Sequence, residues 1–214
     1  MQFSFNDYII LAMVLISLTS FLQRPSPLYL KLFPIYFSSS LIVEMIEDYL
    51  GAHGIHNTGI FNVAGTIEFC FYYFIFREII VNNKARRIIL YVIFLYPLVC
   101  AIALYLQKTV GFNSFNYTVG SLITVLFSIY YYVELFQKTE TQSLARLPAF
   151  WIATGIFFTT VCTFPMYALI SFMTAIPKII HDNIFVIFYI ISVLSSILIS
   201  IGFLCRLRIG KSTL

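Results

Sequence analysis

Charged residues are scarce in this sequence. Only 10% of the 214 residues are Asp, Glu, Lys or Arg, whereas a soluble domain carries about 25%. Hydrophobic residues make up 60% of the chain, and the mean hydropathy is +0.92. So few charges exclude a soluble globular domain, a disordered chain and a nucleic-acid-binding protein. The composition instead indicates an integral membrane protein with little chain outside the membrane.

Long polar segments between the apolar stretches are also lacking. Seven apolar stretches, most of them close to the ~20 residues that cross a bilayer as a helix, follow one another with short breaks rich in Pro, Gly and Asn. The predicted spans are residues 8–22, 28–50, 59–81, 87–106, 117–137, 148–173 and 184–204. The sequence therefore predicts an all-α polytopic membrane protein, with residues 1–214 forming a single seven-helix transmembrane bundle.

Basic residues are almost absent from one side of this predicted bundle. Of the 13 Lys and Arg residues, only Lys108 and Lys178 fall on the side that holds the N-terminus. Because basic residues accumulate in cytoplasmic loops, we expect the N-terminus outside and the C-terminus inside. The net charge of +4 then belongs to the inner face and implies no nucleic-acid partner.

Motifs of several known classes are missing. The span 184–204 contains no lysine to hold retinal as a Schiff base, so no retinal is expected. No histidine lies inside a span, which excludes hydrolases that hold zinc with membrane-embedded histidines. The G-x-S-x-G and Walker motifs are absent. We expect no soluble output domain, so any signal passes through a partner.

The few acidic residues include several at membrane depth, where charge is costly and usually functional. Glu44, Glu47 and Asp48 share one face of the second span because their spacing is i, i+3 and i+4. The third span carries Asn62 and Glu68. Since these two spans are antiparallel neighbours, we expect Glu44 and Glu68 to approach each other near the outer side.

Three interpretations of these residues stay open: structural groups, the lining of a ligand pocket open to the outside, or metal ligands. The pocket would be lined by Glu44, Glu47, Asn62, Glu68 and Asn116. A zinc site would use His53, His56 and His181, all on the predicted outer side. The pair His53-x-x-His56 lies in a Gly-rich loop and matches no helical zinc motif, so the metal signal is weak.

Small and hydroxylated residues form a stripe on the fifth span. Asn116, Gly120, Thr124 and Ser128 are each four residues apart, and serines recur along the seventh span. Such stripes favour close helix packing. A polar cavity between these helices is the alternative, and it would indicate a small transporter or channel.

Short motifs carry a resemblance to a known family. They are Asn57-Thr-Gly-Ile-Phe-Asn62, Thr66-Ile-Glu68-Phe-x-Phe-Tyr72, Phe115-Asn116-Tyr-Thr118 and Pro148-x-Phe150-Trp151-Ile. Through them the chain resembles a family of small seven-span proteins from Bacteroidota that are often encoded near sensor histidine kinases. The resemblance implies a multi-pass protein of the inner (cytoplasmic) membrane with a histidine kinase as partner. Its matching polar positions are Glu44, Asn57, Asn62, Glu68, Asn116 and Trp151.

We therefore expect a non-enzymatic sensory or signalling module in the lipid bilayer. It would bind a small or lipidic ligand near the outer leaflet and act through a partner such as a histidine kinase. A small transporter or channel is the first alternative. A metal-dependent membrane enzyme using the three histidines is the second.

Overall fold

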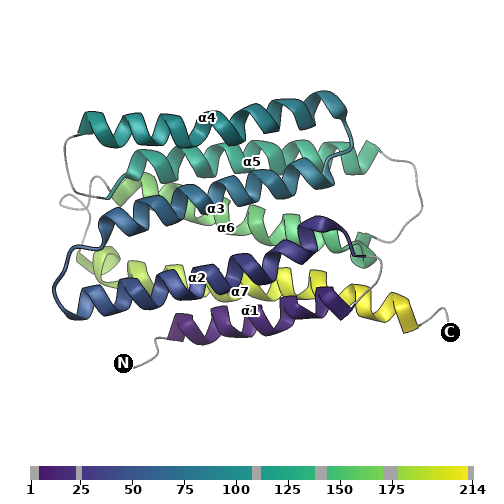
Figure 1. The fold of residues 1–214 in the computed structure, drawn as a ribbon, viewed down its shortest axis with the longest axis horizontal. Coiled ribbons are helices and arrows are strands. Elements are labelled where there is room, and N and C mark those ends of the chain that lie inside the picture. Colours follow the sequence, from purple (N-terminus) through teal and green to yellow (C-terminus); the bar gives the residue numbers. More distant parts are fainter. Residues whose placement is uncertain (1–4, 23–25, 108–111, 138–143, 171–177, 212–214) are drawn as a thin grey trace.

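The computed structural model of this chain is a bundle of long helices (Figure 1). It describes residues 5–22, 26–107, 112–137, 144–170 and 178–211. Within these residues there are seven α-helices, one short 3-10 helix and no strand. They are α1 (Phe5–Leu22), α2 (Leu28–Ala52), α3 (Thr58–Ile79), α4 (Asn83–Gln107), α5 (Ser114–Gln137), η1 (Leu144–Arg146), α6 (Pro148–Ile170) and α7 (Lys178–Lys211). The predicted all-α, seven-helix class is confirmed, since all seven α-helices are long and apolar enough to cross a membrane.

The helix ends differ from the predicted ends for local reasons. α4 begins at Asn83, four residues before the predicted start at 87. The side-chain oxygen of Asn82 accepts hydrogen bonds from the backbone N–H groups of Lys84 (2.9 Å) and Ala85 (3.4 Å), and so caps the first turn. α1 begins at Phe5, which places two polar residues, Asn6 and Asp7, inside its first turn.

Consecutive helices run antiparallel (Figure 1). Packing contacts connect α1, α2, α3, α5, α6 and α7 into a ring, which closes where α7 packs against α1. α4 lies outside this ring and packs mainly on α3. The α6–α7, α5–α6 and α1–α2 pairs pack most extensively, whereas α2 and α3 pack much less on each other.

The centre of the bundle is built around α3. Phe69, Tyr73, Ile75 and Phe76 of this helix are all buried. Phe69 and Tyr73 make edge-to-face contacts with Tyr96 of α4 at ring distances of 6.0 and 5.4 Å. Such aromatic pairs add to the packing that holds membrane helices together.

α2 is attached to this core only near its first residues. Its buried residues are Tyr29, Leu30, Phe33 and Pro34, all within the first two turns. The ring contacts that it makes with α3 in the described residues involve only Phe33 and Tyr36. The rest of α2, up to Ala52, has no buried residue. The seam between α2 and α3 is therefore closed at one end of the bundle and loosely packed at the other.

Basic residues gather at the closed end. Lys31, Arg77, Lys84, Arg86, Arg87, Arg146, Arg206, Arg208 and Lys211 lie in helix segments at this end, whereas Lys178 begins α7 at the other. This is the distribution that the sequence predicts. The side of the membrane that each end faces stays a prediction.

Candidate functional site

The structure divides the five predicted ligand residues into two groups. Asn62 and Asn116 meet between α3 and α5, where both are buried. Glu44, Glu47 and Glu68 lie instead along the loosely packed seam of α2 with its neighbours α1 and α3. The two groups use their polar atoms in different ways.

Asn116 is the centre of a buried hydrogen-bond network. Its Nδ2 donates to the backbone oxygen of Asn62 (3.3 Å) and to Oγ1 of Thr66 (2.9 Å). Its Oδ1 accepts from the hydroxyl of Tyr96 and from the thiol of Cys100. Asn116 thereby joins α3, α4 and α5, and it is fully buried (0% exposed). In a membrane interior, such a satisfied polar group acts as a specific contact between helices.

Asn113 extends this network to the start of α5. Its side-chain oxygen accepts from the backbone N–H of Asn116 (3.2 Å), which is N-cap geometry for α5. The backbone N–H of Asn113 donates in turn to Oδ1 of Asn62 (3.0 Å). The hydroxyl of Tyr117 donates to the backbone oxygen of Phe61 (2.7 Å). These contacts give Asn62, Asn116 and Tyr117 protein partners and fix the two helices in register.

The small-residue stripe on α5 also serves packing. The hydroxyls of Thr124 and Ser128 are buried and donate to backbone oxygens one turn earlier in their own helix. Gly120 lies against the rings of Phe69 and Tyr96, and its backbone oxygen accepts from the hydroxyl of Tyr73 (3.1 Å). The contacts favour the packing interpretation of this stripe over a polar path.

The acidic group takes its hydrogen bonds from three helices. Oε1 of Glu44 accepts from Nδ2 of Asn6, which is on α1, at 2.7 Å. Oε1 of Glu68 accepts from the hydroxyl of Tyr72, one turn further along α3, at 2.5 Å. Tyr36 of α2 also interacts with Glu68 and stands between the two helices. The acids thus lie where α1, α2 and α3 meet.

Few donors face these carboxyl groups. Glu44 is close enough to Asp7, Asp48 and Glu68 to interact electrostatically with each, and Glu47 with Glu44. Oε1 of Glu47 is buried and has no hydrogen-bond partner in the part of the chain that the structure describes. An unpaired buried carboxylate oxygen is costly. The arrangement therefore favours a positively charged or donor-rich molecule beside it.

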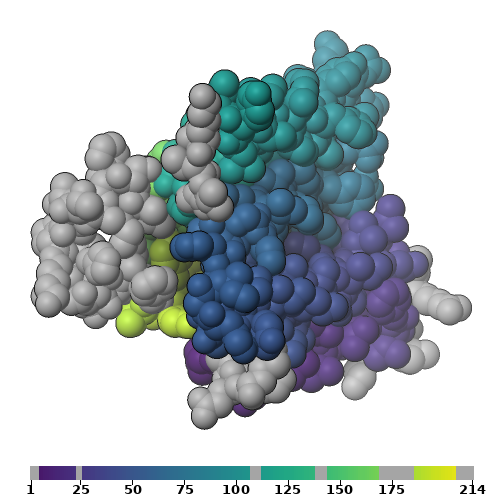
Figure 2. Space-filling view, turned by 60° about the vertical axis from the view of Figure 1, so that its left-hand side comes forward, coloured from purple at the N-terminus to yellow at the C-terminus, as the bar shows by residue number. Residues whose placement is uncertain are grey.

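The acids are arranged at increasing depth. With a rise of about 1.5 Å per residue, Glu47 and Glu44 lie about 8 and 12 Å from the end of α2 at Ala52. Glu68 lies about 15 Å from the start of α3 at Thr58. Figure 2 turns this end of the bundle forward and shows the α2–α3 turn, in blue, between α1 in purple and the teal helices. The three acids therefore lie at increasing distances from the α2–α3 turn, towards the middle of the membrane.

The histidines do not form a metal centre in the described residues. His53 contacts the backbone oxygen of Tyr49 through Nδ1 at 2.8 Å and packs on its ring at 4.3 Å. His56 is exposed in the α2–α3 turn. The side chain of His181 lies outside the described residues. No group of three His, Cys, Asp or Glu side chains suited to a metal occurs among the side chains that are described. The zinc interpretation gains no support and stays a prediction.

Sequence reasoning missed Asn6, Asp7 and Asn113, and it missed Tyr36 as a neighbour of Glu68. Asn6 and Asp7 precede the predicted first span, although an antiparallel hairpin places them opposite the last turns of the second span. Tyr72 is predictable beside Glu68, because it follows Glu68 by four residues on the same helix face, and the hydrogen bond between them confirms this. Asn113 is a standard N-cap residue directly before α5.

Comparison with known proteins finds no matching protein family, no similar curated protein and no similar solved structure. The functional argument therefore rests on the site itself.

Proposed function

We propose that this chain is a non-enzymatic sensory module of a membrane. It binds a small or lipidic ligand that carries a positive charge, at the acids where α1, α2 and α3 meet. The observation that carries the proposal is the buried, unpartnered Oε1 of Glu47 beside Glu44, within the described residues, in a seam where α2 is loosely packed. A cationic group would supply the missing donor, and an apolar tail would lie along the membrane.

The fold supports a sensory role because α3, α4 and α5 are firmly joined to one another, whereas the hairpin of α1 and α2 is joined to α3 at fewer points. The network around Asn116 fixes α3, α4 and α5 to one another. The hairpin of α1 and α2 is joined to α3 mainly near Phe33 and Tyr36. A ligand at the acids would change the position of this hairpin relative to the fixed helices. A membrane partner, for which the sequence resemblance suggests a sensor histidine kinase, would respond to that change.

Dodecylammonium is the probe for the binding part of this proposal, with dodecanol as its uncharged counterpart. We expect dodecylammonium to raise the unfolding midpoint of the purified protein in nonionic detergent more than dodecanol does. The double variant Glu47→Gln/Glu68→Gln should bind the amine at least about tenfold more weakly, because each charge-assisted hydrogen bond contributes about 1.5–3 kcal/mol. Glu134→Gln, which changes an acid at the opposite end, serves as the control and should bind normally.

The sensory part is tested by hydrogen exchange on the same samples. We expect the amine to change exchange in α1 and in residues 40–52, and to leave α5 unchanged. Equal effects of dodecanol and dodecylammonium, or equal losses in the acid variants and in Glu134→Gln, would overturn the ligand proposal. Binding without any change of exchange in α1 and α2 would overturn the sensory role.

A further inference from the structure

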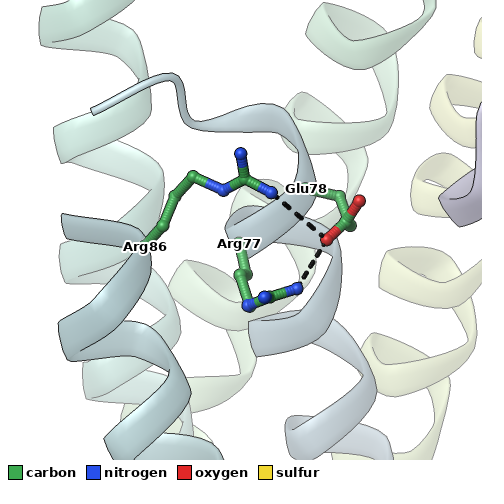
Figure 3. A network of polar contacts seen from close by, with 3 residues as sticks. All are labelled: Arg77, Glu78 and Arg86. Atoms are coloured by element: carbon green, nitrogen blue, oxygen red, sulfur yellow. Dashed lines mark hydrogen bonds and ion pairs between the residues drawn. The ribbon is translucent and has the colours of Figure 1, made fainter. Parts of the chain in front are cut away.

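Two guanidinium groups converge on one carboxylate at the basic end of the bundle (Figure 3). Nη1 of Arg77 lies 2.7 Å from Oε1 of Glu78, and Nη2 of Arg86 lies 3.6 Å from the same oxygen. Arg77 and Glu78 end α3, and Arg86 lies in the first turn of α4. Two positive charges therefore share one negative charge at the turn between these helices.

Much of the hydrogen-bonding capacity of these arginines is still available. Glu78 contacts a single nitrogen of each guanidinium group, and each group has several N–H donors. Nε of Arg77 is buried and has no hydrogen-bond partner within the described residues. The side chains of Arg77 and Arg86 are 30% and 37% exposed, so a ligand can reach both.

The surroundings add positive charge. Lys84 and Arg87 lie in the first turns of α4, and Arg146 is exposed at the same end. Glu134 is the nearby acid that the structure describes besides Glu78. Its two carboxylate oxygens accept from the backbone N–H groups of Val81 and Asn82, both at 2.8 Å. Its hydrogen bonds thus go to the α3–α4 turn rather than to the arginines.

We propose that Arg77 and Arg86 bind the phosphate group of an anionic phospholipid. Both arginines lie at the ends of membrane-length helices, which is the level of lipid headgroups. A guanidinium group matches a phosphate with two parallel hydrogen bonds, and basic residues at a membrane surface attract anionic lipids. The phosphate would stand beside Glu78 and take the donors that this carboxylate leaves free.

The test titrates the purified protein in nonionic detergent with phosphatidylglycerol, phosphatidylcholine or inorganic phosphate. Lipid adducts are counted by native mass spectrometry at about 0.15 M ionic strength. We expect phosphatidylglycerol to bind at least about tenfold more tightly than phosphatidylcholine. Both lipids offer a phosphate to the arginines, but the trimethylammonium group of phosphatidylcholine is repelled by the surrounding Lys and Arg side chains. Inorganic phosphate should bind far more weakly, because it lacks the acyl chains that hold the headgroup at this level.

Three variants separate a local site from general attraction. Arg86→Gln should weaken phosphatidylglycerol binding about tenfold. Arg146→Gln, the matched control at the same end, should weaken it less than about twofold, because exposed charges are screened. Glu78→Gln should strengthen binding several-fold, because it removes the carboxylate that competes with the phosphate.

Glu78→Gln and Arg86→Gln should change the affinity for phosphatidylglycerol in opposite directions. The proposal can therefore be tested even where one of the two variants is less stable. Equal losses in Arg86→Gln and Arg146→Gln would show diffuse attraction and overturn it. Weaker lipid binding in Glu78→Gln, or inorganic phosphate that binds as tightly as phosphatidylglycerol, would also overturn it.

Discussion

Replacing Asn116 by leucine should destabilise the protein by about 2–4 kcal/mol. Leucine has a similar size, so the main loss is polar. The thiol of Cys100 loses its Oδ1 acceptor, and the Nδ2 contacts to Asn62 and Thr66 are lost. The hydroxyl of Thr66 still donates to the backbone oxygen of Asn62 (2.9 Å). Tyr96 keeps one acceptor, because its hydroxyl also contacts the backbone oxygen of residue 116 at 3.0 Å. This remaining hydrogen bond of Tyr96 limits the loss of stability to about 4 kcal/mol.

The free energy of unfolding of Asn116→Leu is measured by titrating SDS into mixed micelles. Ser128→Ala is the matched control, since Ser128 is equally buried on the same helix and donates only to the backbone oxygen of Thr124. We expect this control to change the free energy of unfolding by less than about 0.5 kcal/mol, because such a bond to the preceding turn does not stabilise a helix. Equal losses in the two variants would contradict the role given to Asn116.

The seven spans were predictable because each one is a long apolar run that differs from its flanking turns in composition. The acids at membrane depth were predictable for a related reason, since Glu44 and Glu68 interrupt apolar stretches. The signal in both cases is local and does not depend on how the helices pack.

The partners of the polar residues depend on which way each helix face turns. The predicted pocket includes both Asn62 and Glu68, yet six residues at about 100° each place them about 120° apart around α3. Asn62 accordingly faces α5, and Glu68 lies beside Tyr36 of α2. Helix geometry alone therefore argues for separating these two residues, although it does not give their partners.

Glu134 shows that contacts between residues far apart in the chain could not be predicted from the sequence. Its place near the end of the fifth span predicts an interfacial side chain. The structure adds what the sequence could not give: its carboxylate accepts hydrogen bonds from the backbone of Val81 and Asn82, more than 50 residues earlier. A contact of this range leaves no local pattern, because it arises only when α5 packs beside α3.

Replacing Gly120 by alanine should destabilise the protein by about 2–3 kcal/mol, although alanine favours helices over glycine. A Cβ atom at this position would overlap the ring of Phe69 and the hydroxyl of Tyr96, which are both buried and packed against each other. Because both rings are almost fully buried, we expect the helices to separate. We expect a lower unfolding midpoint in the same SDS titration.

Gly59→Ala is the control for this substitution, because Gly59 lies in the first turn of α3 and a methyl group there would meet no atom within 4 Å among the described residues. It should be neutral or up to about 1 kcal/mol more stable than the parent. Adding Phe69→Leu to Gly120→Ala should recover part of the lost stability, since it removes the ring that the new methyl group meets. If Gly120→Ala matched Gly59→Ala, the close approach of α5 to α3 and α4 would be refuted.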